Sequence, residues 1–284
     1  IVFNCHSFTI RRKSNFIFTW QMDFKPLYKM RFFFHISFKG SRYCGWQRQI
    51  KGIPSVQEVI EQALQKSEGI SIPVMGCGRT DAGVHASCFY AHVDVADCPD
   101  IHKLNLCLPD DIVVHAVIPV DEKSHARYDA LSRTYTYRIH TQKDAFSFDL
   151  SYFYKREILF PELMQDACKW VVETRDFKAF CKTPDRHKST MCSVLECSWK
   201  FDFGSGKHSF QIKANRFLKS MVRILVHDML ALGEGKLSAD EFKRCLGGER
   251  NKQIHRIAYP QGLYLTHVDY SYILEKINKD FCNF

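Results

Sequence analysis

The sequence predicts an α+β fold built around a largely antiparallel sheet. Strand-like and helix-like segments are mixed in both halves of the 284-residue chain. Residues 195–203 alternate strictly between apolar and polar positions, and the turn 204–206, Gly-Ser-Gly, leads into a second strand-like segment at 210–212. This pattern predicts a β-hairpin with one packed face. A parallel sheet would require strands that alternate regularly with helices, and this pattern is not present in the sequence.

The first predicted elements are a buried strand and an amphipathic helix. Residues 30–38 are aromatic and apolar, which is typical of a strand in the core. After the loop 41–53, Ser55 and Glu58 have the spacing of a capping box, so a helix begins there and Gly69 ends it. The residues of its apolar stripe recur at helical spacing and are Val56, Val59, Ile60, Ala63 and Leu64.

Three further strands are predicted at 88–95, 112–120 and 134–139 from their β-branched and aromatic residues. In the last of them, Tyr135 and Tyr137 share one face because side chains alternate along a strand. A helix is expected to begin at Pro161, and a later one, capped by Asn215, to run to Gly233.

The C-terminal part closes with a short helix and a strand. Ser238 and Glu241 form a second capping-box pattern, and glycines 247 and 248 stop the helix that follows. Residues 263–270 predict the last strand.

Composition narrows the class of protein and of partner. The formal net charge is +9, which fits a polyanionic partner or a protein that is merely basic. No apolar run approaches the ~18 residues of a membrane span, so no membrane partner is expected. None of the twelve cysteines forms a Cys-x-x-Cys pair, and the nearest two, Cys192 and Cys197, have no second pair at matching spacing. We therefore expect reduced thiols in a reducing compartment and no metal.

The N-terminal segment differs from the rest of the chain. Residues 1–22 contain no acidic residue but do contain Arg11, Arg12 and Lys13. This composition is typical of an organelle transit peptide, but it equally fits sequence upstream of a true start at Met22 or Met30. In either case an arm of residues 1–28 is expected to lie outside the fold, as is a tail at 276–284. The expected location is the cytoplasm, with an organelle as the alternative.

Residues 76–86 are the most informative stretch. They read Gly-Cys-Gly-Arg-Thr-Asp-Ala-Gly-Val-His-Ala and place Arg79 two residues before Asp81 among three glycines. Glycine allows unusual backbone conformations and close approach, so this segment can aim a carboxylate into a site. The alternative is a surface turn with a solvated ion pair. No second acidic residue lies nearby, which argues against the paired carboxylates of glycoside hydrolysis.

This segment and several others carry a resemblance to a known family. Residues 78–85 resemble the signature of the TruA family of tRNA pseudouridine synthases. Further blocks agree in the family's order: Gly-Trp-Gln-Arg-Gln at 45–49, the block 126–137, the block 213–223, and Gly-Leu-Tyr-Leu at 262–265. The resemblance covers roughly residues 30–270.

The resemblance implies a fold, a reaction and partners. It implies two related α/β halves, 29–130 and 131–275, whose largely antiparallel sheets join around a central RNA-binding cleft. It implies isomerisation of uridine to pseudouridine at positions 38–40 of the tRNA anticodon arm. No cofactor and no essential metal are implied, and the partners are tRNA and a second copy of the chain in a homodimer.

The resemblance also assigns candidate catalytic residues. Asp81 is the nucleophile or base, and attack at C1′, attack at C6 and removal of a sugar proton all remain open. Arg223 is the expected ion-pair partner of Asp81, although it could be a solvated helix residue. Tyr135 matches the active-site tyrosine, although it could be an ordinary core residue like Tyr137. Arg79 either pairs with Asp81 or enters the RNA stack that the target base has left; a phosphate contact is its third reading.

The expected RNA-binding residues are basic residues beside aromatic ones, and exposed charge that serves only solubility is the alternative. They are Arg42, Arg48, Arg127, Arg133, Arg216 and Lys219. Leu263 or Leu265 is a candidate wall of the base pocket, with the core as its default place. His85 is expected to be a structural hydrogen-bonding residue.

Two alternative functions are a silent RNA-binding protein and a nucleobase deaminase. A silent RNA-binding protein on the same fold would bind tRNA without changing a base, but the combination of Asp81, Tyr135 and Arg223 argues against it. A nucleobase deaminase requires His-x-Glu and Cys-x-x-Cys zinc ligands, and neither motif occurs in the sequence.

Overall fold

The computed structural model describes residues 29–49, 52–69, 71–249 and 256–273. The expectations about the arm 1–28 and the tail 276–284 lie outside these residues. Within the described ranges, no helix is long and apolar enough to cross a membrane. The same ranges hold no group of three or more His, Cys, Asp or Glu residues that could bind a metal ion.

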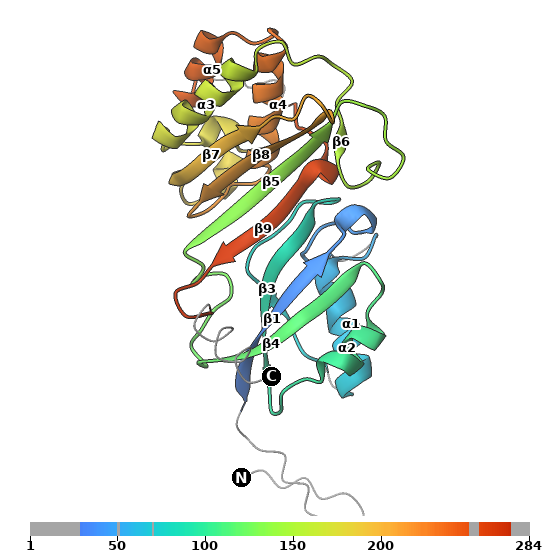
Figure 1. Ribbon diagram of the computed structural model, residues 1–284. Helices are drawn as coiled ribbons and strands as arrows, with labels where there is room; N and C mark the ends of the chain where they lie inside the picture. Colours follow the sequence, from blue (N-terminus) through green and yellow to red (C-terminus); the bar gives the residue numbers. More distant parts are fainter. Residues whose placement is uncertain (1–28, 50–51, 70, 250–255, 274–284) are drawn as a thin grey trace, which may run out of the picture.

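Nine strands form one sheet, with β2 beside β3 and β6 beside β5. The main path of the sheet runs in the order β4-β1-β3-β9-β5-β8-β7 (Figure 1). Their bounds are β1 Met30–Phe38, β2 Met75–Gly76, β3 His85–Val95, β4 Ile112–Val120, β5 Ser132–His140, β6 Tyr152–Phe153, β7 Val194–Lys200, β8 Lys207–Ala214 and β9 Leu263–Asp269. Neighbouring strands are antiparallel except for β3–β9 and β5–β6. The prediction of a mixed fold with a large, mostly antiparallel sheet is therefore confirmed.

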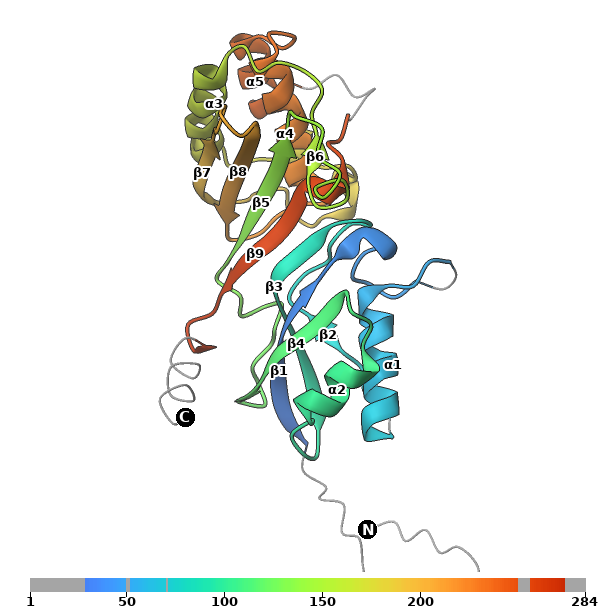
Figure 2. The same cartoon turned by 45° about the vertical axis from the view of Figure 1, so that its right-hand side comes forward.

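The helices cover two stretches of this sheet (Figure 2). Helices α1 (Val56–Glu68) and α2 (Ile101–Cys107) pack with β1, β3 and β4 in one hydrophobic cluster. Helices α3 (Pro161–Glu173), α4 (Met221–Gly233) and α5 (Ala239–Leu246) pack with β5, β7 and β8 in a second cluster. Strands β3 and β9 join over only two residue pairs, His85 with Tyr264 and Ala86 with Leu265. The segments carrying the candidate site meet near this junction.

Most local signals in the sequence led to the expected element. Ser55 caps α1 by accepting a hydrogen bond from the Glu58 N–H, and Gly69 ends the helix with φ of 73°. Strands β1 and β4 have the predicted bounds, and α3 begins at Pro161. The capping box of Ser238 and Glu241 opens α5. These signals act within one turn of chain, which is why the sequence alone carries them.

Three predictions about elements were incomplete or wrong. Helix α2, capped by Asp100, was not predicted because it is only seven residues long. Leu195 is exposed, because a bulge between Val194 and Glu196 turns Val194 into the core instead. Asn215 does not cap α4: its side chain accepts a hydrogen bond from the Ser193 N–H at 2.8 Å, and the helix begins at Met221.

Candidate active site

The glycine-rich loop 76–83 is held by the loop that precedes α1. A Cβ on Gly76 would lie 2.5 Å from the Trp46 indole, so only glycine lets the ring pack there. Gly45 has φ of 105°, and a Cβ on it would lie 2.4 Å from the Thr80 carbonyl oxygen. The backbone N–H of Trp46 donates a hydrogen bond to the same oxygen at 3.3 Å. The block 45–49 therefore sets the course of the backbone that carries Asp81.

One oxygen of the Asp81 carboxylate is fixed by two donors from the start of α4. Arg223 Nη1 donates to Oδ2 at 3.1 Å, and Ser220 Oγ donates to the same atom at 2.9 Å. Arg223 is itself oriented, because its Nε donates to the Ala258 carbonyl oxygen at 2.7 Å. Among the described residues no donor binds the other oxygen, Oδ1. The carboxylate, whose side chain is 27% exposed, thus has one anchored and one available oxygen.

Ser220 is the site residue that the sequence analysis missed. It has φ of 61°, the one positive φ of a residue other than glycine in the described ranges. A serine before a helix usually accepts a hydrogen bond from the first turn, but the Ser220 side chain makes no such cap. Its hydroxyl is turned to Asp81 instead. The signal available in the sequence was a serine three residues before Arg223 inside the matched block 213–223.

The two candidate tyrosines of β5 lie in different surroundings. Tyr135 is half-buried, packs against both hydrophobic clusters, and meets Phe217 edge-to-face at 5.0 Å between ring centroids. Burial raises the pKa of Tyr135 above its ordinary value, and the nearby Cys77 and Asp81 add to the effect. Tyr137 is fully buried and donates to the Tyr259 carbonyl oxygen at 2.7 Å. Of the two, Tyr135 is therefore the tyrosine whose pKa is influenced by the Asp81 charge, whereas the Tyr137 hydroxyl is held by the backbone.

Comparison with known proteins points to one family. The sequence profile of a family described as tRNA pseudouridine synthase matches residues 167–271. The protein named tRNA pseudouridine synthase A from Azobacteroides pseudotrichonymphae is 36% identical over 244 residues, 84% of this chain and 96% of the relative. The protein of the same name from Porphyromonas gingivalis is 37% identical over 246 residues, 84% and 97% of the two chains. A relative from Clostridium tetani is 34% identical over 240 residues, 83% and 97% of the chains.

The chain belongs to the TruA family of tRNA pseudouridine synthases. It is accordingly an isomerase that modifies tRNA, and the remaining candidate residues can be placed relative to that activity. Arg79 is exposed and forms no ion pair with any described residue. Asp81 is paired with Arg223 instead. Arg79 therefore does not pair with Asp81 in the structure.

Arg133 is engaged inside the protein. Its Nη2 donates to the carbonyl oxygens of Cys77 and Arg127, both at 2.7 Å, and its Nη1 donates to that of Asn215 at 3.3 Å. The Arg133 guanidinium therefore binds the residue that precedes the block 78–85, a residue of its own block 126–137 and a residue of the block 213–223. This arrangement makes Arg133 a support of the Asp81 loop.

The other basic candidates are all exposed, and they divide into residues with an ion pair and residues without one. Arg42 is paired with Asp111 at 2.7 Å, and Arg48 is paired with Glu61. The candidates that are exposed and form no ion pair with a described residue are Arg127, Arg216 and Lys219. Leu263 is only 6% exposed and packs in the core, and Leu265 is buried still more deeply.

His85 has a structural environment. It is buried, its Nδ1 accepts a hydrogen bond from the Gly40 N–H at 3.0 Å, and its ring stacks on Tyr264 at 4.6 Å. Burial lowers the pKa of His85 to about 4, so the ring is neutral at physiological pH. It therefore joins the first strand's loop to the β3–β9 junction, as expected for a structural hydrogen-bonding residue.

Proposed function

We propose that this enzyme isomerises uridines at positions 38–40 of the tRNA anticodon arm, with Asp81 as the catalytic carboxylate acting on a flipped-out nucleotide. The observation that carries the proposal is the anchoring of Asp81. Arg223 and Ser220 hold Oδ2, and Oδ1 is left available. A carboxylate can serve as a nucleophile or as a base, and the free oxygen can approach the substrate.

The reaction breaks the N1–C1′ bond of the nucleoside, turns the uracil and forms a C5–C1′ bond; C5 loses its proton and N1 gains one, so the product is an isomer of the substrate. Asp81 initiates it at C1′, at C6 or at a sugar proton, and the anchored oxygen fixes its direction in each case. Tyr135 is placed to stack on the uracil or to move the proton at C5. Arg79, exposed beside Asp81, can fill the gap left by the flipped base, because a planar guanidinium stacks on neighbouring bases.

We also propose how tRNA is held. Arg127, Arg216 and Lys219 supply phosphate contacts, because their charges are exposed and unpaired among the described residues. The substrate lies in a cleft between the two halves, 29–130 and 131–275. The chain acts as a homodimer that binds each tRNA across both subunits.

Mapping the product tests this function. Purified enzyme incubated with unmodified tRNA transcripts should create pseudouridine at positions 38–40, detected by mass-shift labelling of the modified base and fragment mass spectrometry. Pseudouridine only at other positions would overturn the assignment to the anticodon arm. Tight tRNA binding with no modified base would favour the silent RNA-binding alternative.

Ser220 is expected to act as a positioning residue for Asp81. Ser220→Gly and Ser220→Ala both remove the hydroxyl, and each should lower kcat about tenfold with little change in KM, since the loss of a hydrogen bond to a charged group is worth ~1.5 kcal/mol. Ser220→Ala should be less stable than Ser220→Gly by about 1 kcal/mol, because alanine keeps the unfavourable positive φ. Kinetics and chemical denaturation measure the two effects separately.

Ser220→Asn supplies the matched control. Asparagine tolerates positive φ and its amide can donate, so it should recover part of the lost kcat. If kcat fell only in Ser220→Ala, the backbone conformation and not the hydroxyl would matter, and the positioning role would be wrong.

A further inference from the structure

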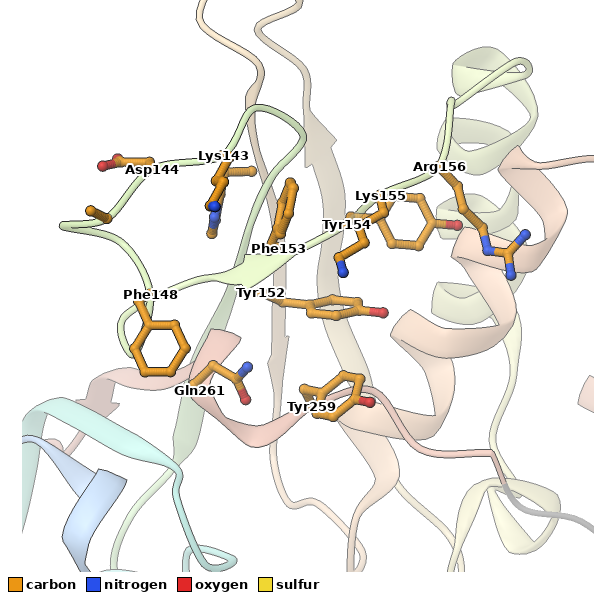
Figure 3. Close-up of a pocket in the computed structure, with 12 residues that line it drawn as sticks. Lys143, Asp144, Phe148, Tyr152, Phe153, Tyr154, Lys155, Arg156, Tyr259 and Gln261 are labelled. Atoms are coloured by element: carbon orange, nitrogen blue, oxygen red, sulfur yellow. The ribbon is translucent and has the colours of Figure 1, made fainter.

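A second candidate site is lined in part by Tyr259, which follows directly on Ala258, the residue whose carbonyl oxygen binds Arg223. A cavity of ≈ 820 Å³ is lined by the loop after β5, strand β6 and residues 259 and 261; Figure 3 shows how its lining residues lie. Rings of Phe148, Tyr152 and Tyr259 line it, and Phe148 and Tyr259 are 77% and 59% exposed. Tyr152 and Tyr259 lie 5.0 Å apart between ring centroids, tilted by 41°. Such exposed, partly stacked rings leave faces open to a planar ligand.

Cations stand among these rings. The lining residues include Lys143, Lys155 and Arg156, all exposed, and the Lys155 ammonium lies 5.6 Å from the centre of the Phe153 ring. Arg156 also pairs with Glu234 at 3.6 Å, so the two lysines are the cations without an ion pair to a described residue. The acidic lining residue, Asp144, accepts hydrogen bonds from the Phe146 N–H and the Ser147 hydroxyl, so its oxygens serve the local turn. Aromatic faces interleaved with cations are the features that bind single-stranded nucleic acid, because bases stack on the rings while phosphates meet the charges.

The cavity is connected to the catalytic carboxylate through one short segment. Ala258 accepts the hydrogen bond of Arg223, Tyr259 lines the cavity, and a Cβ on Gly83 would lie 2.8 Å from the Pro260 ring. A chain bound in the cavity would therefore lie beside the loop that carries Asp81. In tRNA, positions 38–40 adjoin the unpaired nucleotides of the anticodon loop, which are free to stack on protein rings.

We propose that this cavity, lined by Phe148, Tyr152, Tyr259, Lys143, Lys155 and Arg156, is a stacking subsite for an unpaired nucleotide of the same tRNA. The inference rests on the proposed anticodon-arm substrate. A second copy of the chain is the other occupant to consider, but the buried centre of a subunit interface is depleted of lysine. The charge of the lining therefore favours RNA.

Equilibrium binding tests the subsite without turnover. The probes are full-length tRNA and an anticodon stem-loop, both with cytidine at positions 38–40, measured by fluorescence anisotropy. Phe148→Ala and Tyr259→Ala should each weaken binding about tenfold, the loss expected for one stacked base. Lys155→Gln should reduce the slope of log Kd against log salt by about 0.7. Leu106→Ala and Lys103→Gln, exposed residues of α2 outside the cavity, are the matched controls.

The stacked nucleotide can be located by moving a 2-aminopurine through the anticodon loop. One position should lose fluorescence on binding the wild-type chain and keep it with Phe148→Ala. Affinities equal to those of the control variants would overturn the subsite, as would a change of oligomeric mass in light scattering, which would make the cavity a subunit interface. If only full-length tRNA bound, with the cavity variants still weakened, the anticodon-arm assignment would fail and the subsite would stand.

Discussion

Replacing Asp81 with asparagine should abolish isomerisation while leaving tRNA binding intact. Asparagine has the same shape and can still accept hydrogen bonds from Arg223 and Ser220, so the loop should keep its course. It offers no negative charge to begin the reaction. We expect kcat to fall by roughly 10⁴-fold or more, the scale seen when an essential catalytic group is removed. The measurement is release of tritium from C5-labelled uridine in tRNA, because C5 exchanges its hydrogen for C1′.

The matched control is Asp97→Asn, which changes an exposed carboxylate beyond the next strand. It should release tritium at the wild-type rate. The Kd of Asp81→Asn for tRNA should stay within about twofold of wild type, since the change removes no phosphate contact. Full activity of Asp81→Asn would remove this carboxylate from the mechanism.

Replacing Arg223 with lysine should be nearly as damaging, although the charge is kept. The guanidinium uses Nε for the Ala258 carbonyl oxygen and Nη1 for Asp81, and one ammonium cannot reach both. The carboxylate would lose its fixed direction, and a misplacement of about 1 Å can cost 10²-fold in rate. We therefore expect kcat to fall about 10²-fold with KM little changed, measured by the same tritium release.

Stability should report the same loss independently. Arg223 is 15% exposed, and a hydrogen bond to a charged group contributes ~1.5–3 kcal/mol, so the free energy of unfolding should fall by about 1–3 kcal/mol. Arg244→Lys, on the exposed side of α5, should change neither quantity. An Arg223→Lys enzyme with wild-type kcat would show that the ion pair is only structural.

Local signals predicted most of the elements. The caps at Ser55 and Ser238, the proline at 161 and the glycine at 69 each specify their own turn, and the structure has all of them. Where a long-range contact competes with a local signal, the prediction failed. Asn215 was expected to cap α4, but its side chain binds the Ser193 N–H, 22 residues away in sequence. A capping preference of about 1 kcal/mol is easily outweighed by such a contact.

Arg133 shows the same limit for function. An arginine beside aromatic residues in a basic protein is typical of a phosphate contact, and the sequence contains nothing to distinguish this from an internal role. The structure brings the carbonyl oxygens of Cys77, Arg127 and Asn215 to it, from segments as far as 82 residues away. Backbone oxygens have no sequence signature, so this role could only be seen in three dimensions.

The sequence by itself determined the mixed elements, the family and the short set of residues from which the site is drawn, because propensity, capping and motif spacing are properties of neighbouring residues. Only the tertiary structure decided that Asp81 pairs with Arg223 and not with Arg79, that the Tyr137 hydroxyl is bound to a backbone carbonyl, and that Ser220 donates a hydrogen bond to Asp81. Ser220 lies 139 residues from Asp81 in the sequence, and Arg223 lies 142 residues from it. The periodicity of the sequence indicates which face of a helix or strand a side chain lies on, but its contact partners from distant segments are known only from the folded structure.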